Sequence, residues 1–346
     1  MTKTAAPLAP RTVAPTALPL PFATDVPEPG ICALPGFADL DGSNDRIVIL
    51  GDTQVTPVWQ FWKERNGALT KAILAELAAR FPAAIINLGD LVVTGASRGH
   101  WRVFDDLHAP VRAARIPYFA VRGNHDYRGP RDRALAHRDA RLPHLQGRPW
   151  HAFRFRYAGI ALLDSNFRTL GRGRANAQAR WLERTLAEME ASPDIQVVIC
   201  CTHHPPYSDS LTPWPHKEVQ RRFLRPFQML RKPGLFFSGH IHSYERFRFS
   251  DKHFIVSGGG GGHRSRVRTG HDLRMPGNAY LGPPVRPLHF CQLDLRPDGL
   301  KLRAECVEGP GPYHFVTIDE LDLPIRERAR GRSRRIEEAT AQASGL

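Results

Sequence analysis

The sequence predicts an α/β fold with a largely parallel β-sheet. Two observations carry this prediction: short apolar runs of strand length recur along the chain, and amphipathic stretches with helical periodicity lie between them. Strands that alternate with helices are typical of parallel sheets, because the chain must cross back over the sheet before each new strand begins. At 346 residues, of which 42% are hydrophobic, the chain is long enough for one large domain or two.

The predicted elements follow in chain order. Five apolar runs are predicted strands: Ile47–Leu50, Ala83–Leu88, Tyr118–Val121, Val197–Cys201 and Leu235–Phe237. Apolar residues spaced three or four apart predict helices over Gly67–Arg80 and Asn176–Glu190. Two further segments, Ala152–Leu163 and Leu288–Val307, alternate apolar and polar residues around turns expected at Gly159 and at Asp298-Gly299. This alternation predicts antiparallel strand pairs that flank the core.

The two ends of the chain differ from its middle. Residues 1–36 carry eight prolines, so residues 1–40 are predicted to form an extended arm. The folded domain is expected over residues 41–318. The basic tail is placed at residues 319–346, where the stretch from Ile325 to Leu346 contains six arginines and no apolar stripe.

Charge and hydropathy narrow the classes of protein. The formal net charge is +14, which favours anionic partners such as phosphates, nucleic acid or acidic lipid; an arginine-rich coding bias explains it equally well, and both explanations stay open. No apolar run approaches the roughly 18 residues that a membrane-spanning helix needs, so an integral membrane protein is excluded. The five cysteines are odd in number and contain no CxxC pair, which predicts reduced, mostly buried thiols in a cytoplasmic protein.

Polar residues follow each of the five predicted strands. The five exits are Gly51-Asp52-Thr53-Gln54, Gly89-Asp90, Gly123-Asn124-His125-Asp126, Thr202-His203-His204 and Gly239-His240-Ile241-His242. The carboxyl ends of strands border the ligand crevice of open α/β sheets, so we expect these side chains to converge. Their oxygen and nitrogen donors suit Mn²⁺, Fe, Zn²⁺ or Mg²⁺, and they are too many for a single ion.

Each of these pieces alone has an ordinary structural interpretation, because Gly-Asp is common in turns and a single histidine is usually a packed or surface residue. Their combination is more specific. At average residue usage, a given four-residue string occurs by chance at roughly one position in 10⁵. Finding GNHD, GHIH and two Gly-Asp exits in this order therefore points to one site.

The ordered motifs resemble those of the calcineurin-like metallophosphoesterase superfamily, whose pattern is D-x-H, GD, GNH[DE], H and GHxH. The resemblance spans about Arg46 to Gly262. It implies two facing β-sheets flanked by helices, with a dinuclear metal site at the strand ends. It implies that Asp52, the residue at 54 and His242 bind one ion, that Asp90 bridges both, and that Asn124, His203 and His240 bind the other. It also implies that His125 donates a proton and is held by Asp126.

Two departures from the family pattern matter for the metals. Gln54 stands where the pattern has histidine, as in members similar to the manganese-dependent ADP-ribose/CDP-alcohol diphosphatases. We expect two divalent ions per chain. Because Gln54 offers an oxygen donor, Mn²⁺ is the expected metal, with Fe, Zn²⁺ or Mg²⁺ as alternatives. The stretch GHIHSYER is similar to purple acid phosphatases, but Val93 stands where those enzymes place an iron-binding tyrosine, so no purple chromophore is expected.

Four residues beside the ligand positions are predicted substrate contacts, with packing behind the ligands as the alternative: His204, Tyr207, Tyr244 and Arg246. The predicted activity is hydrolysis of phosphoric esters by water activated at a dinuclear metal centre, on a phosphorylated small molecule or a nucleotide. Monoester, diester and diphosphate substrates stay open. The alternatives are a nuclease, which would need a long basic groove, and a catalytically weak scaffold that binds nucleic acid or a protein through its basic surface.

Overall fold

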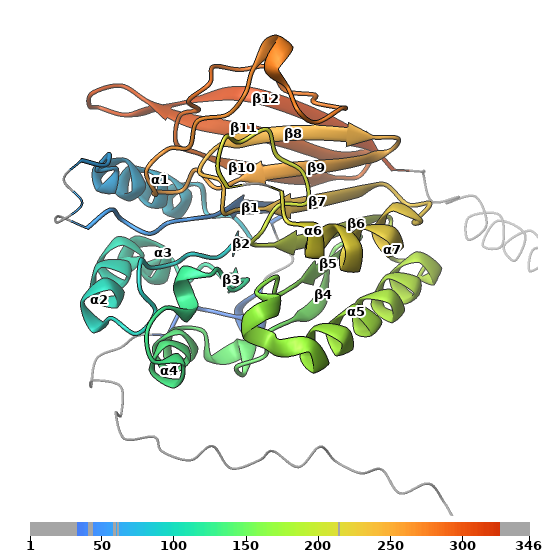
Figure 1. Ribbon diagram of the computed structural model, residues 1–346, viewed down its shortest axis with the longest axis horizontal. Helices are drawn as coiled ribbons and strands as arrows, with labels where there is room; N and C mark the ends of the chain where they lie inside the picture. The colour runs from blue at the N-terminus through green and yellow to red at the C-terminus, as the bar shows by residue number, and fades with distance from the viewer. Residues whose placement is uncertain (1–32, 41–43, 58–59, 61, 214, 326–346) are drawn as a thin grey trace, which may run out of the picture.

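The computed structural model describes residues 33–40, 44–57, 60, 62–213 and 215–325. Twelve strands within these ranges form two six-stranded sheets that pack face to face (Figure 1). The strand order is β12-β11-β10-β1-β2-β3 in the first sheet and β4-β5-β6-β7-β9-β8 in the second. This architecture confirms the prediction of an α/β fold with two facing sheets.

The first sheet joins a parallel half to an antiparallel half. Its parallel strands are β1 (Arg46–Leu50), β2 (Ala84–Asn87) and β3 (Tyr118–Ala120). Its antiparallel strands are β10 (His289–Arg296), β11 (Gly299–Glu308) and β12 (His314–Pro324). The pair β10–β11 turns at Pro297-Asp298, next to the turn that the sequence predicts.

The second sheet is parallel at its centre and antiparallel at both edges. The parallel strands are β5 (Ala158–Leu162), β6 (Val197–Thr202), β7 (Gly234–Ser238) and β9 (Lys252–Ser257). The edge strands are β4 (His151–Phe155) and β8 (Tyr244–Phe249).

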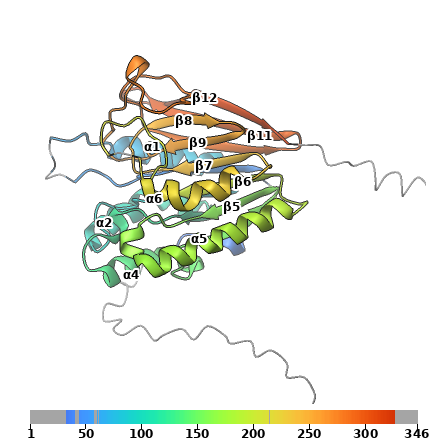
Figure 2. The same ribbon diagram turned by 45° about the vertical axis from the view of Figure 1, so that its right-hand side comes forward.

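Helices cover both outer faces, so the layers run helix, sheet, sheet, helix. On one side lie α1 (Gly67–Arg80), α2 (Arg98–Leu107) and α3 (Ala109–Ala113), and α4 (Arg131–Arg141) follows β3. On the other side lie α5 (Phe167–Ala191), α6 (Lys217–Val219) and α7 (Arg225–Gln228), as Figure 2 shows for α5 and α6. Among the described residues, no helix combines the length and the apolar character needed to cross a membrane.

Strand β6 shows how the two apolar cores are separated. Val197, Ile199 and Cys201 lie in the core between the sheets, whereas Val198 and Cys200 lie in the core under α5 and α7. Side chains alternate across a strand, so a strand buried on both faces is apolar at every position. The adjacent cysteines therefore face opposite cores, and the thiols of the four described cysteines are free and buried.

The predicted strands and helices are all present, with small shifts at their ends, and α5 begins nine residues before the predicted helix. The turn predicted at Gly159 is wrong. The chain turns at Arg156-Tyr157, where Arg156 has a φ of 53°, and Gly159 lies inside β5 paired with Arg154. Gly159 is small for a packing reason, because a Cβ there would lie 2.9 Å from Met189 Sδ.

The structure also bears on the predicted ends of the domain. The boundary at residues 318/319 falls inside β12, whose pairing with β11 continues to Pro324. The strand therefore runs six residues into the segment predicted as tail. Of the predicted N-terminal arm, residues 1–32 lie outside the described residues, and so do residues 326–346 of the tail; Leu34 is buried in the core between the sheets.

Candidate metal centre

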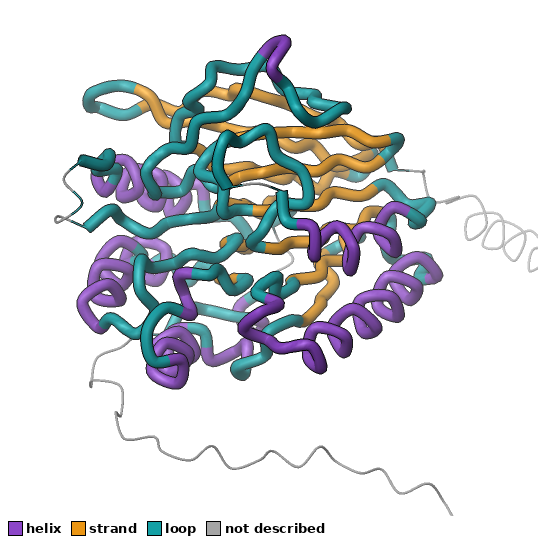
Figure 3. Tube along the Cα trace, viewed as in Figure 1, coloured by secondary structure: helices purple, strands orange, loops and turns teal. Residues whose placement is uncertain are grey.

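The predicted ligand loops meet at one end of the two sheets. β1, β2 and β3 run parallel to one another in the first sheet, and β6 and β7 do so in the second, so the loops that follow these strands gather at one end of each sheet. Figure 3 shows the loops, in teal, gathered at the left-hand ends of the strands. The two sheets thus contribute donors to one centre from opposite sides.

Three of the candidate ligands have an unusual backbone. Asp52, Asp90 and His240 have φ values of 59°, 54° and 68°, in the left-handed region that residues other than glycine rarely occupy. Such a conformation costs on the order of 1 kcal/mol or more per residue and is found mostly where function requires it. It turns each side chain sharply away from its strand and into the space between the loops.

The two carboxylates are buried and held by backbone amides. Asp52 Oδ2 accepts a hydrogen bond from the amide of His240 at 2.9 Å, which ties the exit of β1 to the exit of β7. Asp90 Oδ1 accepts the amide of His125 at 2.8 Å. These bonds use one oxygen of each carboxylate, and the second oxygen faces the histidines of the cluster.

Three histidines are anchored in the same way. The Nδ1 atoms of His203, His242 and His125 lie 2.8, 2.6 and 2.8 Å from backbone carbonyl oxygens. The three carbonyls belong to Leu88, His263 and Val93. A carbonyl oxygen only accepts, so each Nδ1 carries a proton, and in the neutral ring the lone pair is therefore on Nε2. This arrangement is typical of metal-binding histidines, whose second nitrogen is fixed by an outer hydrogen bond.

The donor atoms lie within a few ångströms of one another. His203 Nε2 is 3.0 Å from Asn124 Oδ1, 3.1 Å from His240 Nδ1 and 3.4 Å from Asp90 Oδ2. On the other side of Asp90, Asp52 Oδ1 is 3.3 Å from His242 Nε2. The ligand atoms of Asp52, Asp90 and His203 all fall within 4.8 Å of one another, as the ligands of a shared metal site do.

Burial and close charges perturb the ionisation of the cluster. Burial opposes protonation of His203, but the carboxylates of Asp90 and Asp52 raise the pKa of this ring to about 9. Burial by itself would raise the pKa of Asp90, yet His203 and His125 hold it well below its ordinary range. Burial and the charge of His203 lower the pKa of His240 to about 3. The site thus concentrates negative charge that a cation can neutralise.

Gln54 carries an observation that bears on metal binding. Its Oε1 atom is buried and has no hydrogen-bond partner among the described residues. Its Nε2 atom lies 3.4 Å from both Asp90 Oδ2 and His242 Nε2. Rotating the amide by half a turn would direct Oε1 at the same point, where a cation would satisfy it. The donor set at this end of the sheets therefore fits divalent metal ions.

A comparison with known families agrees with this geometry. A family model described as calcineurin-like phosphoesterase matches residues 45–244, which contain every candidate ligand. The chain belongs to the calcineurin-like phosphoesterase family. It is a phosphoesterase. No protein with a curated description matches its sequence.

Solved structures share the fold of this phosphoesterase at low sequence identity. A purple acid phosphatase from yellow lupin (Lupinus luteus) seeds has a TM-score of 0.57 at 16% identity, covering 77% of this chain and 52% of that one. The phosphoesterase thus spans about half the length of the lupin protein. GAP50, the anchor in the inner membrane complex of Plasmodium, has a TM-score of 0.61 at 17% identity, covering 82% and 89%. A dimetal phosphatase from Danio rerio has 0.52 at 15% identity, covering 79% and 99%.

The predicted role of Asp126 in the phosphoesterase requires a correction. Its carboxylate does not hold His125, whose ring is anchored by the Val93 carbonyl. Instead Asp126 accepts three backbone amides, from Gly123 at 2.8 Å, Leu91 at 2.9 Å and Asp90 at 3.1 Å. Asp126 therefore binds the loop after β2 to the loop after β3 and fixes the position of Asp90. Burial, together with the nearby Asp90 charge, raises the pKa of Asp126 to about 7.

His204 is the one predicted substrate contact that the structure brings to the cluster. Its ring centroid lies 4.5 Å from that of His240, and its Nδ1 is 2.9 Å from Ser165 Oγ. Because burial lowers the pKa of His204 well below its ordinary value, the ring is neutral.

The other three predicted contacts are used elsewhere. Tyr207 packs against Phe249 and Phe254 in the core under α7. Tyr244 is fully buried, and its hydroxyl donates to Asp319 of β12 at 2.7 Å. Arg246 donates to both carboxylate oxygens of the same Asp319, at 2.6 and 2.9 Å. The contacts of these three residues therefore match the packing alternative.

The five consecutive glycines of Gly258–Gly262 support the centre in a way that sequence patterns do not reveal. All five are buried, and the amide of Gly262 donates to Asp52 O at 2.9 Å. A Cβ at Gly258 would lie 2.7 Å from Asp52 Oδ2, and one at Gly262 would lie 2.4 Å from the His242 ring. The segment is glycine because its backbone packs directly against two candidate ligands.

Proposed function

We propose that this phosphoesterase hydrolyses phosphoric esters with water activated at a dinuclear metal centre. One observation carries the proposal: the donors form two sets that meet at Asp90. Asp52, Gln54 and His242 form one set, in which His242 Nε2 lies 3.3 Å from Asp52 Oδ1 and 3.4 Å from Gln54 Nε2. Asn124, His203 and His240 form the other, in which His203 Nε2 lies 3.0 Å from Asn124 Oδ1 and 3.1 Å from His240 Nδ1.

Asp90 lies between the two sets. Its Oδ2 is 3.4 Å from Gln54 Nε2 in the first set and 3.4 Å from His203 Nε2 in the second. A carboxylate in this place can serve both ions and fix the distance between them. Two sets of three donors that share a carboxylate supply enough ligands for two ions and too many for one.

The proposed reaction depends on the bound cations and on two histidines of the chain. Two divalent cations, when bound, lower the pKa of a water molecule and neutralise the charge that grows on the phosphoryl oxygens. His125 lies beside the cluster, with Nε2 3.8 Å from Asp90 Oδ2, and its side chain is one-fifth exposed. In its doubly protonated form it is placed to donate the Nε2 proton to the leaving oxygen, and the Val93 carbonyl fixes the ring through Nδ1. His204, whose ring centroid lies 4.5 Å from that of His240 and 4.9 Å from that of His203, is proposed to contact the phosphoryl group.

We propose Mn²⁺ as the preferred metal, with Fe, Zn²⁺ and Mg²⁺ as the alternatives. Together with Asp90, the first set offers three oxygen-donor residues when Gln54 binds through its Oε1, and a single imidazole. Oxygen donors favour harder cations than imidazole does. The proposed substrate is a phosphorylated small molecule or a nucleotide, as a monoester or a diester. The proposed compartment is the cytoplasm, which the free and buried thiols support.

Elemental analysis and model substrates test the proposal together. The protein is purified without chelators, its metal content is measured, and rates are determined on p-nitrophenyl phosphate and bis-p-nitrophenyl phosphate. We expect about two ions per chain, loss of activity on chelation, and recovery on adding Mn²⁺. Full activity with one ion or none would contradict the dinuclear centre, and absence of hydrolysis on both esters with two bound ions would contradict the hydrolase.

A second candidate function is a scaffold, because one protein with the same fold is named as an anchor. The structure of the candidate centre favours the enzyme. A scaffold has no need of a left-handed backbone at Asp52, Asp90 and His240, which costs stability and directs these side chains into one cluster. Binding of a protein or nucleic acid without any hydrolysis at full metal loading would favour the scaffold.

A further inference from the structure

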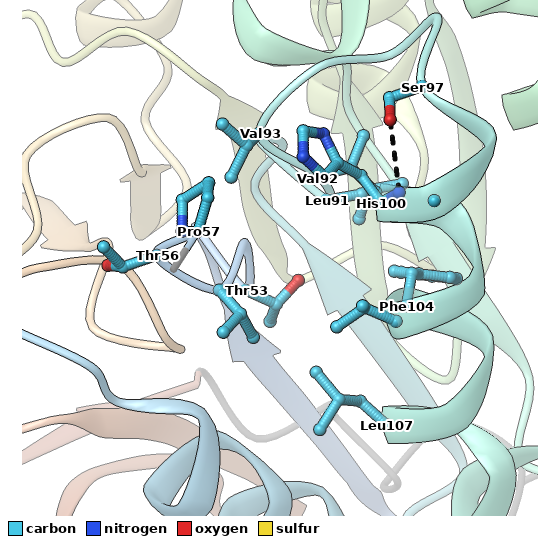
Figure 4. A pocket seen from close by; sticks show the side chains of 13 residues that line it. Thr53, Thr56, Pro57, Leu91, Val92, Val93, Ser97, His100, Phe104 and Leu107 are labelled. Atoms are coloured by element: carbon cyan, nitrogen blue, oxygen red, sulfur yellow. Dashed lines mark hydrogen bonds between the residues drawn. The ribbon is translucent and has the colours of Figure 1, made fainter. Parts of the chain in front are cut away.

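A second feature of the fold adjoins the candidate centre: an apolar cavity of about 410 Å³ between α2 and the loops that follow β1 and β2. Figure 4 shows Phe104 and Leu107 of α2 on one side, with Thr53 and Pro57 of the loop after β1 on the other. Pockets that bind small organic molecules are commonly about 300 to 1,000 Å³ and mostly apolar. The cavity has the size and character of such a pocket.

The cavity lining carries no charge. Among the described residues that line it there is no Asp, Glu, Lys or Arg, and its only titratable side chain is His100. Burial lowers the pKa of His100, so this ring is neutral at pH 7. The Ser97 Oγ accepts the His100 amide at the start of α2 (Figure 4). The chain carries a net charge of +14, yet the lining of the cavity next to the candidate metal centre is uncharged.

Part of the cavity lining and three of the candidate ligands lie on the same two loops, after β1 and after β2. Thr53 lines the cavity and stands between Asp52 and Gln54 in the chain, and Leu91, Val92 and Val93 line it directly after Asp90. Val93 also holds the ring of His125 through its carbonyl oxygen at 2.8 Å. The proposed proton donor is therefore anchored to the cavity wall. A leaving group that receives its proton from His125 departs on this side of the centre.

We propose that the cavity binds the leaving group of the substrate, and that this phosphoesterase acts on phosphoric esters of apolar alcohols or phenols. The inference rests on the proposed function and gives it a substrate class. An uncharged, apolar body enters the cavity while the phosphoryl group stays at the metal centre. A charged or sugar-like leaving group is disfavoured, because the cavity offers few partners for its polar atoms.

A series of substrates of equal chemical reactivity tests this. Phenyl phosphates with a 4-methyl, 4-ethyl, 4-propyl or 4-butyl group have leaving phenols of nearly the same acidity, so only the buried apolar area changes. Each methylene that enters an apolar pocket is worth roughly threefold to fourfold in binding. We expect kcat/KM to rise by about this factor per methylene until the cavity is full, and rates that do not depend on chain length would overturn the inference.

A binding measurement makes the test independent of catalysis. Calorimetric titration of 4-butylphenol into the metal-loaded protein should show one site, with affinity that falls along the series toward phenol. Val103→Arg places a charge at the cavity, where Val103 is 43% exposed and can be replaced without repacking the core. It should weaken 4-butylphenol binding at least tenfold and flatten the chain-length series. Asp106→Arg, on the exposed face of α2 outside the cavity lining, is the matched control and should leave both unchanged.

The outcomes separate the two proposals. If 4-butylphenol binds but no phosphate ester is hydrolysed at full metal loading, the cavity is a ligand site and the proposed function fails. If esters are hydrolysed without a chain-length effect and 4-butylphenol does not bind, the proposed function stands and the cavity inference is overturned. An equal loss of 4-butylphenol binding in Val103→Arg and Asp106→Arg would also overturn it, because the binding would then lie elsewhere.

Discussion

The two halves of the segment GHIHSYER do different work, although they are contiguous. His240 and His242, in the loop after β7, direct their rings into the ligand cluster. Tyr244 and Arg246, in β8, direct their side chains to Asp319 of β12 and so connect the edge strands of the two sheets. The first half supplies donor atoms, and the second half fastens the sandwich beside them.

The difference between the halves follows from secondary structure. Loop residues such as His240 can adopt a left-handed backbone and point into the centre. At Tyr244 the chain becomes a strand, where alternate side chains face opposite sides. Tyr244 and Arg246 face Asp319, whereas Glu245 and Phe247 face the opposite side. Resemblance to a family motif therefore extends to supporting residues as well as to the site, and secondary structure tells the two apart.

Of the changes considered, replacement of Asp90 should lower activity most, because its carboxylate lies between the two donor sets to which His240 and His242 belong. Asp90→Ala should remove both ions, because this carboxylate lies against both donor sets. Loss of two cations removes several kcal/mol of transition-state stabilisation, so kcat/KM should fall by on the order of 10³-fold or more. Elemental analysis and kinetics on p-nitrophenyl phosphate check both expectations. One tightly retained ion would assign Asp90 to a single set.

His125→Ala should lower kcat by about 10² to 10⁴, the range for loss of a positioned general acid, while metal content stays intact. The leaving group supplies the internal control. A nitrophenol scarcely needs a proton as it leaves, so the defect should be smaller for p-nitrophenyl phosphate than for an alkyl ester. An equal defect on both substrates would remove His125 from the role of proton donor.

Asp319→Asn tests the fastening half of GHIHSYER. The change leaves the nearly buried guanidinium of Arg246 without its carboxylate, which should lower the free energy of unfolding by about 3 kcal/mol. Urea denaturation of the metal-loaded protein measures this. Metal content and KM should stay within twofold of the unaltered chain, because Asp319 touches no candidate ligand. A large rise in KM with unchanged stability would instead support the substrate contacts predicted for Tyr244 and Arg246.

The sequence predicts the ligand cluster because its signal is local. An apolar run followed by polar residues marks a strand exit, and in four of the five exits a glycine comes first. These exits contain Asp52, Asp90, Asn124, His203 and His240. The anchors of the rings carry no such signal, since Leu88, Val93 and His263 act through backbone carbonyls that every residue possesses. For this reason the family resemblance assigns the orientation of His125 to its neighbour Asp126, although Asp126 accepts hydrogen bonds from backbone amides instead.

Elements that depend on distant partners are also missed. β12 is an edge strand whose exposed face is polar, so its residues lack the apolar pattern of the buried strands, and the predicted boundary at 318 cuts through it. Asp319 pairs with Arg246, 73 residues earlier in the chain. A pairing across that separation is set by the fold and leaves no periodic trace in the sequence.

Glu245 gives a pH-dependent test of the same half of the motif. This fully buried carboxyl accepts the Ser208 hydroxyl at 2.7 Å and the Asp209 amide at 2.6 Å. Burial raises its pKa from 4.5 to about 7. The folded state therefore binds more protons than the unfolded state between about pH 4.5 and 7, so the contribution of Glu245 to stability falls as pH rises through this window.

Glu245→Gln, which has no proton to lose, should be more favourable at pH 8 than at pH 5. The difference in unfolding free energy between the variant and the unaltered chain should shift by on the order of 3 kcal/mol between these two values. Urea denaturation at both pH values measures the shift, and other titrating groups cancel in the comparison. A difference that stays constant with pH would mean that Glu245 ionises normally in the folded protein.

The smallest effect is expected at Gln54, where the donor half departs from the family pattern. The buried Oε1 of Gln54 has no partner, and a half-turn of its amide would direct this oxygen at Asp90 and His242. An amide oxygen is a harder ligand than imidazole, so Gln54→His should tighten the first set for Zn²⁺ relative to Mn²⁺ by about tenfold without abolishing hydrolysis. Titration calorimetry with Mn²⁺, Mg²⁺ and Zn²⁺ measures the affinities, and Gln54→Ala is the control that removes the donor.

If neither variant alters any affinity, Gln54 acts only through the contacts of its Nε2 with Asp90 and His242. A loss in Gln54→Ala together with a switch of metal in Gln54→His would establish Gln54 as a ligand, because loss of those contacts alone would weaken every metal to the same degree.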